Sequence, residues 1–258
     1  MASTTRDRSR LSDPWFIFAG LTLLACVVGI AYGVYVAANR PAQSSEGLGA
    51  SIPQSRQYDY LNVSIIGDSY TDGAGVNNRG LAYTSRAAQS QCWEVNRVAQ
   101  SGTGYTNPGS RDDSRPYTDP ARIRAALASN PQLIIVQGSI SDEKRSGLRD
   151  AALTVFTALR AQAPRETKVV AVGPTTPPDA DPAAIGDVRD AIASAADEAG
   201  VPFIDPIQRG WLRDPGAYTP DGLYLNESGH LQFANDLVQA LLETDLVVGD
   251  SCAPIPAS

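Results

Sequence analysis

Ser69 is the side chain in this 258-residue chain whose type and position best suit nucleophilic chemistry. It follows a run of apolar and β-branched residues, Leu61–Ile66, which predicts a buried strand. That run breaks at Gly67-Asp68-Ser69, and a glycine-rich loop follows. A serine on the turn after a central parallel strand lies at the carboxyl edge of the sheet, where open α/β folds bind ligands. The alternative is a plain turn, in which glycine supplies the geometry and serine a cap.

A serine that transfers an acyl group also needs hydrogen-bond donors for the oxyanion that forms on the substrate. The Ser69 N–H, held at the turn, is one candidate. The second is the N–H of Gly102, which follows another predicted strand, Trp93–Ala99. An ordinary turn between a strand and a helix would also use a glycine at this place. We expect Ser69 and Gly102 to form an oxyanion hole.

The general base of such a site is harder to assign. The chain has one histidine in total, His230, so an imidazole base must be that residue. Asp221, or Glu227 on the same helix face, would orient the ring. The alternative for His230 is a structural role at a helix start. The other candidate bases are a water molecule or Tyr224 poised by Asp221, although a phenol with a pKa of about 10 is a poor base at neutral pH.

Strand-like and helix-like runs alternate along the part of the chain that carries these residues. The predicted strands are Leu61–Ile66, Trp93–Ala99, Leu133–Gln137, Val169–Val172 and Phe203–Asp205. The predicted helices are Leu81–Gln89, Pro120–Ser129, Gly147–Ala161, Pro182–Glu198 and Glu227–Leu242. Short apolar strands separated by helices predict a five-stranded, doubly wound parallel sheet with helices on both faces, which is a three-layer α/β/α domain.

The N-terminal residues predict a single transmembrane helix. Residues 1–14 form a polar head, and residues 15–38 run for 24 residues without a charge, long enough to cross a bilayer. Arginines precede this segment in excess, which predicts a cytoplasmic N-terminus and an extracytoplasmic domain at the plasma membrane. A cleavable signal peptide is the alternative. A flexible linker (39–57) would lead to the domain (58–250), and a loose tail (251–258) would follow.

Charge and cysteine usage limit the partners and cofactors. The net charge of −7 is spread along the chain and argues against nucleic acid as a partner. Cys92 and Cys252 both fall in the exported part, where they would form a disulfide, with two free thiols as the alternative. Cys26 lies inside the apolar segment. Because the cysteine and histidine spacing indicates no metal site, we expect neither a metal nor a cofactor.

The Gly-Asp-Ser turn and its glycine-rich continuation resemble the first motif of the SGNH (GDSL) hydrolase family. The stretch Ser101-Gly102-Thr103-Gly104-Tyr105 resembles the second motif, whose glycine N–H completes the oxyanion hole. The resemblance implies the same three-layer α/β/α architecture and acyl-ester chemistry.

Two later stretches depart from the family pattern. The third motif carries an asparagine that donates to the oxyanion, and alignment on Gly138 and Asp142 places Ser141 at that position. The fourth motif carries the catalytic histidine three residues after an aspartate. Here that aspartate is Asp221, and the histidine position holds Tyr224.

Two functions fit this pattern. The first is a membrane-anchored ester hydrolase or acyl transferase that acts on an acyl ester of a lipid, a glycan or an envelope polymer. In it Ser69 is the nucleophile, Ser141 is a third oxyanion donor, and Asp68 and Tyr224 line the pocket. The second is a pseudoenzyme that keeps the fold and binds such a ligand without turnover, because Tyr224 and Ser141 replace the usual histidine and asparagine.

Overall fold

The computed structural model of the chain describes residues 60–244 and 246. The predicted head, anchor, linker and tail (1–14, 15–38, 39–57 and 251–258) lie outside these residues. Among the residues that are described, no helix is both long enough and apolar enough to cross a membrane.

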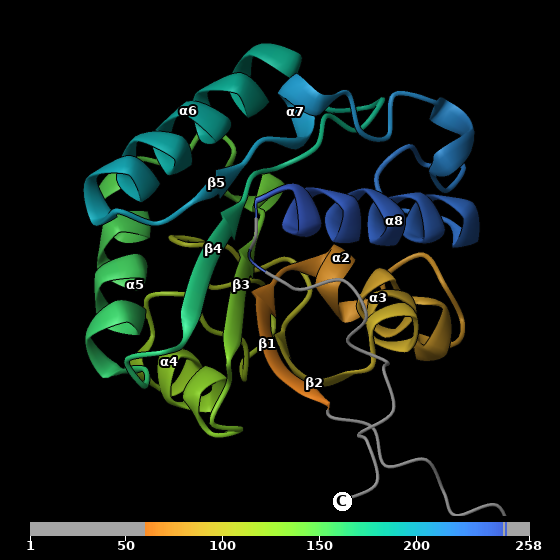
Figure 1. The fold of residues 1–258 in the computed structure, drawn as a ribbon. Coiled ribbons are helices and arrows are strands. Elements are labelled where there is room, and N and C mark those ends of the chain that lie inside the picture. Colours follow the sequence, from red (N-terminus) through yellow and green to blue (C-terminus); the bar gives the residue numbers. More distant parts are fainter. Residues whose placement is uncertain (1–59, 245, 247–258) are drawn as a thin grey trace, which may run out of the picture. The chain divides into compact units, whose positions relative to one another are not determined.

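One parallel sheet runs through the described part of the chain, in the strand order β2-β1-β3-β4-β5 (Figure 1). Its strands are β1 (Leu61–Gly67), β2 (Trp93–Ala99), β3 (Leu133–Gln137), β4 (Lys168–Val172) and β5 (Phe203–Ile204). The chain first steps outward from β1 to β2 and then returns to β3 on the other side of β1. The strand order therefore reverses between β1 and β3, and open α/β sheets bind ligands beyond the carboxyl ends of strands at such a point.

Helices cover both faces of this sheet. They are α2 (Ser69–Asp72), α3 (Tyr83–Gln91), α4 (Pro120–Leu127), α5 (Leu148–Gln162), α6 (Pro182–Ala199), α7 (Pro206–Arg209) and α8 (Glu227–Glu243). The helices α3 and α8 pack on one face, and α4, α5 and α6 pack on the other (Figure 1). The predicted three-layer α/β/α arrangement with a five-stranded parallel sheet is confirmed.

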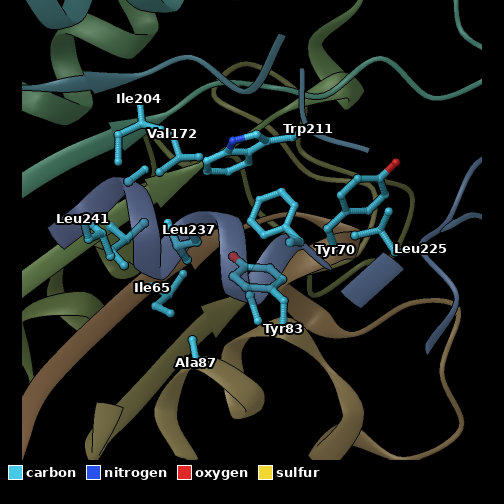
Figure 2. Packing of buried hydrophobic residues seen from close by; sticks show 14 of the residues in the cluster. Ile65, Tyr70, Tyr83, Ala87, Val172, Ile204, Trp211, Leu225, Leu237 and Leu241 are labelled. Carbon is cyan, nitrogen blue, oxygen red and sulfur yellow. The ribbon is translucent and has the colours of Figure 1, made fainter. Parts of the chain in front are cut away.

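The central strands are buried on both faces because their side chains alternate between two cores. Ile65 belongs to a core with Tyr83 of α3 and Leu237 of α8 (Figure 2). Its neighbour Ile66 joins the opposite core with Phe156 of α5. Burial of each such side chain contributes about 1.5–3 kcal/mol. This packing fixes β1, and with it the turn that carries Ser69.

Most of the elements differ from the predicted ones by one or two residues at an end, and two differences affect the residues of interest. The strand β5 stops at Ile204 because Asp205 instead caps α7, where its carboxylate accepts a hydrogen bond from the Gln208 N–H at 3.0 Å. The sequence pattern does not predict the short helix α2. This helix begins at Ser69, and Asp68 is its N-cap.

Cys92 closes α3 and forms a disulfide. Its partner is not among the described residues, so the pairing with Cys252 remains a prediction. A disulfide at this position fits the expectation that the domain is exported to an oxidising compartment.

Candidate active site

Ser69 and Gly102 meet at the carboxyl edge of the sheet. The strands β1 and β2 pair in parallel with Gly67 opposite Ala99, so the turns that follow them leave the sheet side by side. The Gly102 N–H donates to Ser69 Oγ at 2.9 Å. Gly102 has a φ of 74°, in the left-handed region that glycine adopts without strain. The turn therefore points a backbone donor at the serine oxygen.

Asp68 is buried at the start of α2. Its side chain accepts a hydrogen bond from the Tyr70 N–H at 3.0 Å and closes the start of α2, and the residue is only 1% exposed. Burial raises the pKa of Asp68 to about 6, against the opposing effect of hydrogen bonds from the Tyr70 N–H and Ser139. The role of Asp68 as a pocket residue remains a prediction, since in the structure its side chain is buried and bonded to the start of α2. It orients the helix turn on which Ser69 lies.

Asp142, just after β3, anchors the loop that follows Gly102. Its carboxylate accepts hydrogen bonds from the backbone N–H groups of Tyr105, Thr106 and Asn107 at 2.7, 2.9 and 3.0 Å. The Thr106 hydroxyl adds a fourth bond at 2.7 Å. Gly104 lies so close to this carboxylate that a Cβ on it would clash. The matched aspartate of the third motif therefore holds the second-motif loop in place.

Ser141 is bound mainly through its backbone. Its N–H donates to Ser139 Oγ at 2.9 Å, and its C=O accepts from Asn107 Nδ2 at 2.7 Å. Ser69 Oγ accepts its hydrogen bond from the Gly102 N–H. The role of Ser141 as a third oxyanion donor remains a prediction.

Asp221 and Tyr224 lie on a loop before α8. This loop packs against residues 69–75, the segment that begins at Ser69 and is called the serine loop below. The Tyr70 hydroxyl donates to Leu223 O at 2.9 Å, and the backbone carbonyl of Leu225 leaves no room for a side chain at Gly75. Asp221 is exposed and accepts hydrogen bonds from Thr219 Oγ1 and the Leu223 N–H, which lower its pKa, so it stays ionised.

Tyr224 itself is 37% exposed. Its backbone N–H and C=O are both bonded to Thr219, which fixes the loop on either side of the ring. The position where the family has its histidine is therefore ordered, reachable from solvent and adjacent to the serine loop.

His230 is fully buried and bonded at both ring nitrogens. Nδ1 accepts from the Tyr83 N–H at 3.2 Å, which leaves the proton on Nε2 to donate to Ala74 O at 3.1 Å. Burial lowers the pKa of His230 and keeps the ring neutral. Glu227 pairs with Arg86 at 3.0 Å rather than with the imidazole. These contacts argue against His230 as the general base and support the structural alternative, because neither nitrogen is free to take the Ser69 proton.

The described residues contain no group of three His, Cys, Asp or Glu side chains placed to hold a metal ion. The acidic residues near the serine each have other partners. Asp68 and Asp142 bond backbone N–H groups, and Asp72 is paired with Arg79 at 3.0 Å.

A polar cavity of about 210 Å³ lies beside the Gly102 turn. Its lining includes Asp72, Arg79, Gln100, Ser101, Arg111 and Asp113. Ser101 Oγ donates to one oxygen of the Asp72 carboxylate at 2.9 Å, and Arg79 donates to the other. Hydroxyl, carboxylate and guanidinium groups thus line a cavity that reaches Ser101, the residue before Gly102. Sequence motifs do not predict this cavity, because its arginines and aspartates come from the end of α2, the segment before α3 and the loop before α4.

The sequence and the fold agree on the family. The model of the GDSL-like lipase/acylhydrolase family matches residues 65–231, so the chain belongs to this family, and the resemblance to SGNH hydrolases is confirmed. The chain is 29% identical over 207 residues to a GDSL lipase of Mycobacterium tuberculosis, a match that covers 76% of this chain and 87% of the lipase.

Solved structures with this fold include a Lactobacillus plantarum protein with a TM-score of 0.59 at 19% identity, covering 74% of this chain and 100% of that one. A family two carbohydrate esterase of Clostridium thermocellum, in complex with cellohexaose, also has a TM-score of 0.59. That match is 15% identical and covers 73% of this chain and 65% of the esterase. At these identities the two structures establish the fold alone.

Proposed function

We propose that this GDSL-family protein is a membrane-anchored, extracytoplasmic ester hydrolase with Ser69 as its nucleophile. The observation that carries the proposal is the 2.9 Å hydrogen bond from the Gly102 N–H to Ser69 Oγ, beyond the carboxyl ends of β2 and β1, where β1 is one of the two strands that flank the switch point of the sheet. The bond keeps the Gly102 N–H within reach of Ser69 Oγ, so the same N–H would lie close to the carbonyl oxygen of an ester that Ser69 attacks. Donors fixed close to a developing oxyanion are usually the largest contribution to acyl-transfer catalysis.

The proposed reaction has two acyl-transfer steps. Ser69 Oγ forms a bond to the acyl carbon while its proton passes to a water molecule, and the carbonyl oxygen becomes an oxyanion bonded to the Ser69 and Gly102 N–H groups. The intermediate expels the alcohol oxygen, which takes up a proton, and a second water hydrolyses the acyl-serine. A positioned general base contributes about 10²–10⁴-fold. With His230 bonded to backbone, we expect turnover slower than that of an enzyme with an imidazole base.

We infer that the alcohol side of the substrate is a hydroxyl-rich glycan. The polar cavity beside Ser101 supports this choice, since its carboxylate and guanidinium groups can pair with sugar hydroxyls but offer little to an acyl chain. A relative of the same fold is a carbohydrate esterase in complex with cellohexaose, and another relative is a GDSL lipase. Lipid esters are therefore the comparison substrate in any test.

The nucleophile is tested with the full-length chain in detergent, using a fluorophosphonate probe, p-nitrophenyl acetate and acetylated cello-oligosaccharides. The Ser69→Ala variant is expected to lose labelling completely and turnover at least about 10²-fold, since loss of a serine nucleophile costs up to about 10⁶-fold where the base is intact. Ser146→Ala, at an exposed serine, is the control and should match the wild type. Labelling and turnover that persist in Ser69→Ala would rule out this nucleophile.

The second candidate function is a ligand-binding pseudoenzyme. The observation that favours it is the buried, fully bonded imidazole of His230 together with Tyr224 at the family's histidine position. In the same assay, a wild-type protein that binds acetylated oligosaccharide but takes no label and shows no turnover would establish this function instead.

The proposed location rests on the uncharged segment 15–38 and the arginines before it. The disulfide at Cys92 supports an exported domain. We expect the full-length chain to stay in the membrane pellet after an alkaline carbonate wash, and protease added to intact spheroplasts to digest the domain. A shortened chain released by the wash would instead identify a cleaved signal peptide, and a domain protected from protease would place it in the cytoplasm.

A further inference from the structure

The strongest feature that the proposed mechanism leaves unused is Arg122 on α4. This residue is only 4% exposed, and its guanidinium forms no salt bridge with a carboxylate of the described residues, although the charges of Asp68 and Asp119 act on it from a longer distance. An arginine stays protonated in proteins, and a buried charge without a directly bonded counter-ion is costly. Such a residue needs an explanation beyond filling space.

The contacts of Arg122 are with backbone and polar groups around the candidate active site. Nη2 donates to Gly67 O at 3.0 Å and to Val98 O at 2.8 Å, at the carboxyl ends of β1 and β2. Nη1 donates to Gln100 Oε1 at 3.0 Å and to Thr103 Oγ1 at 3.2 Å, on either side of Gly102. A third bond from Nη1 reaches the Arg115 carbonyl at 3.0 Å, and the guanidinium lies over the Tyr117 ring at 5.0 Å from its centre.

These bonds join the two turns on which the proposed reaction depends. Gly67 lies two residues before Ser69, and the Gln100 N–H also donates to Gly67 O at 3.3 Å. One rigid, planar group thus fixes the end of β1 relative to the turn that presents the Gly102 N–H. A shift of either turn would lengthen the 2.9 Å bond from that N–H to Ser69 Oγ.

The charge of Arg122 adds to this geometric effect. Backbone carbonyl dipoles solvate the guanidinium, but they do not cancel its positive charge. The proposed reaction creates a negative charge at the nearby oxyanion, and opposite charges attract more strongly in the protein interior than in water. The cation therefore interacts more favourably with the transition state than with the neutral ester, which is the condition for a rate effect.

We propose that Arg122 is the positioning residue of the oxyanion hole. Its hydrogen bonds hold the Ser69 and Gly102 turns in a fixed relative position, and its positive charge stabilises the oxyanion relative to the neutral ester. This inference rests on the proposed esterase function for its kinetic consequence, but its positioning part can be measured without turnover.

The test compares Arg122→Gln and Arg122→Lys with Arg124→Gln, a control on the exposed side of the same helix. On p-nitrophenyl acetate, Arg122→Gln is expected to lower kcat by about 10²–10³-fold, the effect of a lost oxyanion donor, with KM nearly unchanged. Arg122→Lys keeps the charge without the planar fork and should recover part of that loss. Full kcat in folded Arg122→Gln would overturn the proposal, because a residue that only supports stability lowers the folded fraction and not kcat.

The second readout is the heteronuclear ¹H–¹⁵N NOE of the Gly102 amide, which reports backbone order on the picosecond to nanosecond timescale. We expect an ordered Gly102 in the wild type and in Arg124→Gln, and a mobile Gly102 in the Arg122 variants while the β3 amides stay rigid. If the wild type shows no turnover, the esterase proposal has failed and the NOE of Gly102 alone tests the role of Arg122. A loss of order confined to Gly102 then supports the positioning role. Unchanged order at Gly102 in the Arg122 variants overturns the positioning role. If Arg122→Gln does not fold, Arg122→Lys provides the same comparison.

Discussion

Replacing Tyr224 with histidine is expected to raise the rate of ester hydrolysis by about 10²–10⁴-fold, the usual contribution of a positioned general base. The physical reason is that most of the required arrangement is present. The loop that carries Tyr224 lies against the serine loop through Tyr70 and Gly75, and Asp221 stays ionised three residues before the ring. An imidazole at this place would gain the carboxylate that orients it and would take the Ser69 proton. The measurement is kcat/KM against pH for the full-length chain.

The pH profile distinguishes a new base from a general change in the pocket. In Tyr224→His, kcat/KM should rise through a new titration near the unperturbed histidine pKa of about 6.5. The control is Leu223→His, which puts the same imidazole one residue away at a similarly exposed position and should give no gain. Adding Asp221→Asn to Tyr224→His should remove part of the gain. If Tyr224→His hydrolyses esters no faster than the wild type, the missing imidazole is not what limits this site, and the pseudoenzyme function is favoured.

Replacing Asp142 with alanine is expected to lower the free energy of unfolding by about 3–5 kcal/mol. The carboxylate is 1% exposed and accepts four hydrogen bonds, three of them from the consecutive backbone N–H groups of residues 105–107. Each bond to a charged acceptor contributes about 1.5–3 kcal/mol, and its loss leaves a donor unsatisfied in the protein interior. The measurement is urea-induced unfolding of the full-length protein. The slope of the unfolding free energy against urea concentration should be the same in the variant and the wild type, which shows that both expose the same surface on unfolding.

Asp112→Ala is the matched control for this measurement. Asp112 is an exposed aspartate on the loop between Gly102 and α4, and its loss should change stability by less than about 0.5 kcal/mol. Asp142→Asn keeps the shape and one acceptor and should fall between the control and Asp142→Ala. Equal stabilities for Asp142→Ala and Asp112→Ala would mean that water replaces the carboxylate and that this loop is not anchored as described.

The reassignment of His230 changes what an active form of this protein requires. As the chain's single histidine, it was the natural candidate for an imidazole base. In the structure it instead joins the loop after Ser69, at Ala74, to the start of α3, at Tyr83, from its place on α8. The candidate bases that remain are a water molecule and Tyr224 poised by Asp221, and the slow turnover that we expect of the wild type rests on this proposal.

The local sequence determined the order of strands and helices and the position of Ser69, because burial periodicity and helix-breaking residues act over a few positions. It also determined that a glycine would follow β2, where the chain turns with a positive φ. Tertiary structure alone decided what the polar side chains bind. Asp68 turned inward to cap α2, His230 was bonded by segments about 150 residues away, and Arg122 joined two strand ends. An arginine on a charged helix and a histidine at a helix start look like surface residues in a sequence, since their partners come from distant parts of the chain that only packing brings together.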